Sequence, residues 1–163
     1  MTQAEPLPVE NVQDYPRPPA LEPVPQRISI VLNGQVIAET GGALRVLETH
    51  HAPTYYIPPG DITGALIPVK GSSFCEWKGA ARYFDVSAEG ADGHVATRAA
   101  WAYDSPTARF AALAGYVAFY ASKMDRCTVG DEVVRPQPGD FYGGWQTSNL
   151  TGIVKGAPGT THW

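Results

Sequence analysis

The sequence predicts a single domain that is mostly β, with antiparallel strands, one short helix and a proline-rich N-terminal arm. Short β-rich runs separated by turn residues recur from residue 27 onward. The 163 residues include 17 glycines and 15 prolines, which favours many turns and short elements. Charged residues make up 17% and apolar residues 44%, a balance typical of a globular protein.

The first 26 residues differ in composition from the rest and hold seven of the 15 prolines. Such a segment favours extended polyproline backbone over helix. Two alternatives are open: a disordered tail, because termini are often loose, or an arm that lies on the body. Tyr15, Leu21 and Val24 supply apolar anchors that favour the arm. We therefore expect an arm over residues 1–26 and a single β domain over residues 27–163.

Strand signals follow the arm in order. Residues 27–32 and 35–40 are β-rich runs on either side of Asn33-Gly34, a dipeptide that accepts positive φ at both positions. The sequence therefore predicts a two-residue hairpin there. Further strands are expected at residues 44–49, 55–57, 65–69, 74–77, 82–87, 95–103, 117–120 and 127–129.

One helix is expected, at residues 106–114. Ser105 can cap it, Pro106 fits its first turn, and Gly115 can end it in the left-handed conformation. After Pro136 the glycines, prolines and aromatics lack periodicity, so we expect this part to wrap the body without a large element.

Composition also excludes several classes of partner. A net charge of −4 and a pI near 5.5 argue against a nucleic-acid surface, which usually gathers Lys and Arg. No apolar run approaches the roughly 18 residues that span a bilayer, and the N-terminus lacks the features of a signal peptide. Two cysteines without a close pair motif fit a reducing compartment. We expect a cytoplasmic protein that binds neither nucleic acid nor membrane.

The chemically distinctive residues gather in three clusters, at residues 49–58, 75–79 and 141–145. His50 and His51 are adjacent, so on extended backbone they point to opposite faces and cannot share a metal in the usual way. His94 and His162 stand far away, and no spacing matches a zinc site. We predict no metal and no cofactor. One histidine of the pair could act as an acid or base near neutral pH, or could serve structure alone.

Cys75 and Lys78 form the second candidate group. A lysine near a thiol lowers the thiol pKa and makes it nucleophilic. On one strand the two side chains would face opposite sides unless a turn intervenes. The alternatives are an inert buried thiol and a solvated turn lysine.

Aromatic side chains are the third group of candidates. Most aromatics in a β protein belong to the core, but these lie beside polar, glycine or proline positions. Gly143-Gly144 removes side chains where a ligand or another backbone could approach closely. The predicted ligand-binding aromatics are Tyr55, Tyr56, Trp77, Trp101, Tyr142 and Trp145.

Several segments together form a recognisable pattern. They are Asp14-Tyr15-Pro16-Arg17-Pro18-Pro19, Arg45-Val46-Leu47-Glu48-Thr49, His51, Pro53, Tyr55-Tyr56, Cys75-Glu76-Trp77-Lys78-Gly79, Ala99-Ala100-Trp101, Ala114-Gly115-Tyr116-Val117-Ala118-Phe119-Tyr120 and Phe141-Tyr142-Gly143-Gly144-Trp145. From about residue 14 onward the chain thereby resembles the bacterial family called domain of unknown function 427. It departs from that family at Ala52, where a second proline is common.

The resemblance implies a small antiparallel β domain, similar to the tent-like β folds of the zinc-ribbon exchange factors and the cereblon ligand domain. Those relatives carry paired Cys-x-x-Cys zinc knuckles, which this chain lacks, so a zinc-dependent role does not carry over. The family is sometimes labelled nucleotidyltransferase-like, but no Gly-Ser pair with spaced acidic residues supports that label here.

The function predicted from these residues is binding of a small organic ligand in an aromatic-walled pocket. His51 would be the acid, base or hydrogen-bond partner, Lys78 would hold an anionic group, and Cys75 is a candidate nucleophile. A second hypothesis is an interaction module whose exposed aromatics bind a protein or peptide. The sequence predicts neither a reaction nor an oligomeric state.

Overall fold

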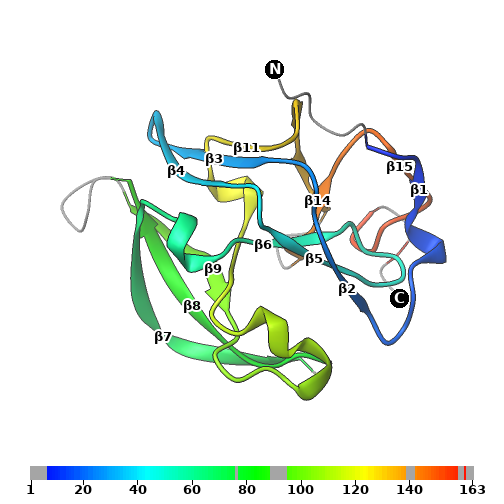
Figure 1. Cartoon of the computed structure of the whole chain (residues 1–163), viewed down its shortest axis with the longest axis horizontal. Coiled ribbons are helices and arrows are strands. Elements are labelled where there is room, and N and C mark those ends of the chain that lie inside the picture. Colours follow the sequence, from blue (N-terminus) through cyan, green and yellow to red (C-terminus); the bar gives the residue numbers. More distant parts are fainter. Residues whose placement is uncertain (1–6, 76, 89–94, 139–141, 158–159, 161–163) are drawn as a thin grey trace.

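The computed structural model describes residues 7–75, 77–88, 95–138, 142–157 and 160. The described chain folds into several small sheets, most of them antiparallel, without closing into a barrel (Figure 1). This arrangement confirms the predicted fold class: mostly β, with short helical turns.

One four-stranded sheet contains the predicted hairpin. Its order is β12 (Glu132–Val133), β11 (Arg126–Val129), β3 (Ile28–Leu32) and β4 (Gln35–Thr40), and every pairing is antiparallel. Asn33 and Gly34 have φ of 52° and 74° between β3 and β4, as a two-residue turn of this kind requires. The hairpin prediction is confirmed.

A second sheet has the order β10 (Val117–Phe119), β9 (Val95–Ala102), β8 (Gly79–Ser87) and β7 (Ala65–Cys75). The sequence predicted two strands where β7 is one, so the break expected after Val69 was wrong. Pro68 and Gly71 lie in a register irregularity between Pro68 and Ser72. A bulge accommodates a residue without an N–H and a glycine with positive φ, so the strand continues past both.

The described part of the arm lies on the body. β2 (Ala20–Pro23) forms the edge of a sheet with β5 (Leu44–Leu47) and β6 (Thr54–Tyr56), and β1 (Glu10–Asn11) pairs in parallel with β15 (Leu150–Thr151). The 3-10 turn η1 (Val12–Asp14) follows β1. Figure 1 shows β1 beside β15 and β2 beside β5. Over residues 7–26, the docked arm is the alternative that is observed.

Arg45 fastens the arm to the body through an ion-pair network. Its Nη2 lies 2.8 Å from Glu10 Oε2 and 2.5 Å from Glu22 Oε1, and its side chain is 14% exposed. Tyr15 Oη donates to Glu10 Oε1 at 2.6 Å. Burial acts to raise the pKa of Glu10, but the hydrogen bonds from Arg45 and Tyr15 leave that pKa below its usual value. Glu10 is therefore held as a carboxylate against the arginine.

A helical segment lies where the helix was predicted, but it is a 3-10 helix and not an α-helix. η3 (Ala108–Leu113) is a 3-10 segment that is irregular at Phe110, where φ is −110° and ψ is 21°. The prediction that Ser105 caps this segment was wrong. Thr107 precedes it instead, donating its hydroxyl to the Trp77 carbonyl and its N–H to the Lys78 carbonyl. These contacts to the turn before β8 replace a helical cap.

Two further 3-10 turns complete the helical content of the described residues, η2 (Pro59–Asp61) and η4 (Ala121–Lys123). No helix among these residues has the length and apolarity needed to cross a membrane. Beyond Pro136 the chain wraps the body as predicted. Among the described residues of this part, the strands are β14 (Trp145–Gln146), which pairs with β13 (Arg135–Pro136), and β15.

The sheets meet at two apolar clusters. The larger lies over the β3–β4–β11 sheet and includes Ile28 and Ile30, both fully buried. The second lies between β5, β6 and the β7–β10 sheet. An isolated bridge joins Ile57 to Val117, whose N–H and carbonyl groups bond reciprocally at 2.8 and 2.9 Å. This bridge holds β6 close to β10 and so positions the residues of the second cluster.

Candidate functional site

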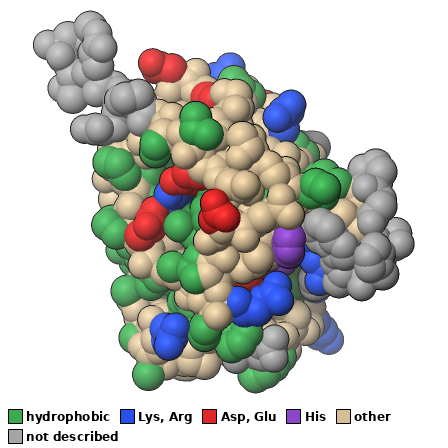
Figure 2. Space-filling view, turned by 90° about the vertical axis from the view of Figure 1, so that its right-hand side faces the viewer, with side chains coloured by type: hydrophobic (Ala, Val, Ile, Leu, Met, Phe, Trp, Pro, Cys, Tyr) green, Lys and Arg blue, Asp and Glu red, His purple; other side chains and the backbone are tan. Residues whose placement is uncertain are grey.

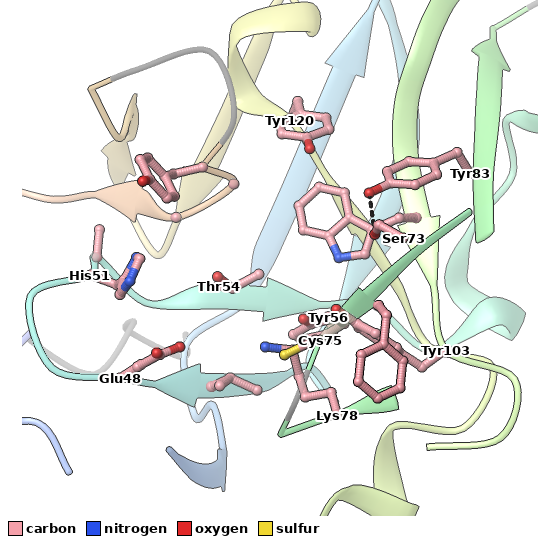
Figure 3. A pocket seen from close by; sticks show the side chains of 17 residues that line it. Glu48, His51, Thr54, Tyr56, Ser73, Cys75, Lys78, Tyr83, Tyr103 and Tyr120 are labelled. Carbon is pink, nitrogen blue, oxygen red and sulfur yellow. Dashed lines mark hydrogen bonds between the residues drawn. The ribbon is translucent and has the colours of Figure 1, made fainter. Parts of the chain in front are cut away.

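A pocket of about 260 Å³ lies between the β2–β5–β6 sheet and the β7–β10 sheet. Figure 3 shows side chains from both sheets, and from the C-terminal segment, turned toward one space. The lining residues are Val46, Glu48, His51, Ala52, Thr54, Tyr56, Ser73, Phe74, Cys75, Lys78, Tyr83, Trp101, Tyr103, Tyr120, Tyr142, Gly143 and Gly144.

Six of the nine predicted site residues line this pocket. They come from five separate segments: the turn before β6, β6 itself, the β7–β8 turn, β9 and the C-terminal segment. The six are His51, Tyr56, Cys75, Lys78, Trp101 and Tyr142. The geometry therefore brings most of the candidates together, while the roles assigned to them stay predictions.

Three predicted aromatics lie elsewhere. Tyr55 and Trp145 are 2% and 1% exposed and stack on each other at 5.1 Å between ring centroids. The Trp145 indole N–H donates to the Phe119 carbonyl at 3.0 Å, so its polar tip serves the core. Trp77 packs against the second apolar cluster from outside the pocket lining. Alternation explains the difference between Tyr55 and Tyr56, because neighbouring residues of β6 face opposite sides.

The predicted separation of the two histidines is observed. His50 has φ of 68°, and this left-handed residue turns the chain just before His51. His51 lines the main pocket, whereas His50 lines a smaller cavity beside it. His94 and His162 lie outside the described residues, as do Glu76 and Phe141 of the distinctive clusters.

Gln137 fixes the hydrogen on the His51 ring. Its Oε1 accepts from the Ala52 N–H at 3.0 Å, and its Nε2 donates to the Lys155 carbonyl at 2.9 Å. These two partners determine which end of the amide is nitrogen. The same Nε2 lies 3.2 Å from His51 Nδ1, so Nδ1 accepts and the ring proton resides on Nε2.

The environment keeps this imidazole neutral. Burial, followed by the positive charges of Lys155, Lys78 and Arg17 and by His50, lowers the pKa of His51 to about 4. A neutral ring whose Nε2 already carries hydrogen is a donor, not a base, toward a group in the pocket. Tyr142 packs edge-on against it, with 5.3 Å between ring centroids. His51 can thus polarise or hold an acceptor atom without changing its charge.

Hydroxyl groups make up much of the remaining polar lining. Five tyrosines line the pocket, and Ser73 and Tyr83, on neighbouring strands of one sheet, share a 2.7 Å hydrogen bond in its wall (Figure 3). The Tyr56 hydroxyl is hydrogen-bonded to the Trp101 indole and to Tyr103. Burial raises the pKa of Tyr56 and of Tyr103 well above the usual value, so both hydroxyls stay protonated.

Cys75 and Lys78 reach the same pocket because the chain reverses between them. β7 ends at Cys75 and β8 begins at Gly79, and these two residues pair across the turn. The Lys78 Nζ lies 5.8 Å from the centre of the Tyr103 ring, a cation–π arrangement. Figure 3 shows the side chains of Cys75 and Lys78 beside Tyr56. From the sequence, Cys75 and Lys78 could face the same side only if a turn lay between them. That turn is observed.

The two glycines allow close approach, as predicted. A Cβ on Gly143 would come within 2.1 Å of the Trp101 ring, and one on Gly144 within 2.5 Å of the Ala52 carbonyl oxygen. Gly143 therefore seats the indole wall of the pocket. Gly144 lets the C-terminal segment pass against the backbone that follows His51.

Sequence reasoning missed several lining residues. Tyr103 and Tyr120 follow strands that were predicted correctly, and Tyr83 lies on one, so alternation along β8–β10 could have placed them. Gln137 gave no signal, because a glutamine between two prolines in an aperiodic segment is ordinarily exposed, yet it is 2% exposed here.

Among the described residues, no group of three or more His, Cys, Asp or Glu side chains is arranged to hold a metal ion. The expected absence of a metal stays a prediction, since two of the four histidines lie outside that set.

The chain was compared with known protein families and with curated proteins. A family model described as Domain of unknown function (DUF427) matches residues 20–130, which is more than half of the chain. The match includes the strands that line the pocket but not the C-terminal segment that carries Tyr142, Gly143 and Gly144. No curated protein matches the chain.

Proposed function

The chain belongs to the family described as Domain of unknown function (DUF427), and we propose that its pocket binds a small organic ligand bearing an anionic group. The observation that carries the proposal is the convergence of a neutral imidazole donor, His51, and a cation, Lys78, on one hydroxyl-rich aromatic cavity. Buried polar groups of this kind are costly unless a partner or a ligand satisfies them.

Charge favours an anionic group near Lys78. Among the described residues, no carboxylate forms an ion pair with this ammonium. Lys155 and Arg17 add positive potential at His51, which lies in the same pocket. A ligand carboxylate or phosphate would meet the Lys78 ammonium directly and could accept the His51 Nε2 hydrogen.

Glu48 adds a hydrogen-bond acceptor to the pocket. It lines the pocket on the same side as Lys78 in Figure 3, and no ion pair joins these two described side chains. A carboxylate at this place accepts hydrogen bonds and favours a hydroxyl or ammonium on the ligand. The proposed ligand therefore carries both an anionic group and a hydrogen-bond donor.

Size and shape restrict the ligand further. The pocket volume of about 260 Å³ equals the liquid volume of roughly nine water molecules. That space suits a compact metabolite, and the Trp101 and tyrosine faces suit a planar or apolar part. The proposal concerns binding and assigns no reaction. His51 as an acid or base and Cys75 as a nucleophile stay predictions.

Native mass spectrometry of protein purified from its own host tests this function. We expect a retained mass of a few hundred daltons at most that dissociates on denaturation, and its loss in Lys78→Ala. Lys70→Ala is the matched control, because Lys70 is exposed on β7 and lies outside the pocket lining. Wild-type protein that carries no small molecule, or equal retention by both variants, would contradict the proposal.

A second candidate function rests on Phe74. This side chain lines the pocket yet is 77% exposed, as an anchor for a partner peptide would be. If Phe74→Ala abolishes capture of a partner while Val36→Ala, which removes an exposed side chain from β4, does not, the interaction module is favoured. The concave shape of the site supports the small ligand instead.

A further inference from the structure

We propose that a second cavity, lined by Arg17, Thr49, His50 and Lys155, is a binding site for a phosphate-class oxyanion. It is distinct from the aromatic pocket, because no described residue lines both. Its volume is about 210 Å³, the liquid volume of roughly seven water molecules, so a phosphate or a small phosphate monoester fits.

The chemistry of the lining selects an anion. Arg17 offers a planar fork of donors that matches phosphate oxygens, and Lys155 offers a compact ammonium. His50 adds a ring that can donate, and none of the described lining residues is an Asp or a Glu. Within the described part of the chain, neither Arg17 nor Lys155 forms an ion pair, so their charge is not already neutralised by a neighbouring acid.

Three separate segments hold these groups in place. The His50 N–H donates to the Val12 carbonyl at 3.0 Å, and the Thr49 hydroxyl donates to the Tyr15 carbonyl, so the turn is fastened to the arm. The Lys155 N–H donates to the His50 carbonyl at 2.6 Å, which fastens the C-terminal segment to the same turn. A site assembled in this way needs little rearrangement to bind.

Backbone strain marks the same turn. His50 has φ of 68°, a left-handed conformation that is unfavourable for a residue with a side chain. The left-handed turn directs His50 into the cavity and His51 into the aromatic pocket. Strain of this kind persists where the surroundings over-determine it, and binding sites are where it gathers.

The lowered pKa of the neighbouring His51 is consistent with a positive potential in this cavity. Lys155, Arg17 and His50 all act to lower the pKa of His51, so their positive potential extends across the wall between the two cavities. Figure 2 shows the face of the molecule that carries β1, β15 and the arm. On it, Lys and Arg side chains lie beside and below a histidine, while acidic side chains gather on the other half.

The test is a titration of ¹⁵N-labelled full-length protein with inorganic phosphate, followed by amide chemical shifts. We expect saturable shifts at Thr49, His50 and Lys155. Arg17→Gln and Lys155→Gln should each weaken binding about tenfold or more, since each removes a charged hydrogen-bonding partner. Arg109→Gln and Lys70→Gln are the matched controls, because both are exposed and outside the cavity lining.

Two ligands distinguish a site for phosphate monoesters from a site for the free phosphate ion. Tighter binding of glycerol 3-phosphate than of inorganic phosphate assigns the site to phosphate monoesters, and equal or weaker binding assigns it to the free ion. Shifts that do not saturate, that spread over the whole surface, or that weaken equally in the control variants would overturn the proposal. Arg17 is exposed, so Arg17→Gln leaves the fold intact and the result interpretable.

Discussion

His51→Gln should remove a defined part of the pH dependence of folding stability. In the folded protein the pKa of His51 is lowered to about 4, by burial first and by Lys155 and Lys78 next, whereas an unfolded histidine titrates near 6.5. The unfolded chain therefore binds more protons between these two values. Stability from the neutral ring is fully present above pH 6.5 and is lost as the pH falls toward 4.

The size of the effect follows from the two pKa values. Each pKa unit corresponds to about 1.4 kcal/mol, so the full loss below pH 4 is about 3 kcal/mol, of which about 2 kcal/mol is already lost at pH 5. Other acidic groups titrate in the same range, but they are common to wild type and variant. The difference between the two proteins isolates His51.

Urea denaturation followed by tryptophan fluorescence measures this difference, because Trp145 is buried and will report unfolding. The free energies of unfolding should be compared at pH 7.5, 6, 5 and 4.5. We expect the wild-type value, relative to His51→Gln, to fall by about 2 kcal/mol between pH 7.5 and 5. A constant difference, or an NMR titration of the His51 ring centred near 6.5, would refute the reasoning.

Two further predictions use paired variants. Arg45→Met should lower the free energy of unfolding by about 3 kcal/mol, because Glu10 stays largely buried without its cation, whereas Arg27→Met, in an exposed pair, should change it by less than about 1 kcal/mol. Equal effects would show that the network does not hold the arm. Gly143→Ala should cost about 1–3 kcal/mol and disturb the Trp101 wall, because the added Cβ overlaps the indole, whereas Gly60→Ala meets nothing within 4 Å. Thermal unfolding compares each pair, and an unchanged midpoint in Gly143→Ala would contradict the packing.

The fold was largely predictable because its signals are local. The Asn33-Gly34 turn and the β-rich runs around it specify a hairpin without help from the rest of the chain. The helix at residues 106–114 was the weakest element, because its form depends on Thr107 binding to carbonyls of the β7–β8 turn, almost 30 residues earlier. The sequence shows capping residues but not such distant partners.

The site was predictable in part for the same reason. Distinctive residues such as His51 and Lys78 identified the right segments, and alternation decides which neighbour faces the pocket. Tyr56 faces it, while Tyr55 stacks on Trp145 in the core. That choice depends on which face of β6 meets the β7–β10 sheet. The bridge between Ile57 and Val117 fixes this face, and it joins segments about 60 residues apart.

Gln137 illustrates what a single sequence leaves hidden. It is the group that sets the His51 tautomer. Its importance arises from three hydrogen bonds formed only when the C-terminal segment closes over the turn before β6. The bond to His51 fixes the ring hydrogen on Nε2, while burial and nearby positive charges lower the pKa of the ring.

The most direct test of the central claim is crystallography with a panel of small aromatic carboxylates and their uncharged amide analogues. We expect a carboxylate to bind in the main pocket, with its oxygens in hydrogen-bond contact with Lys78 Nζ and His51 Nε2. We also expect weaker occupancy for the matching amide. Carboxylates found only elsewhere on the protein, or amides bound equally well in the pocket, would contradict the claim.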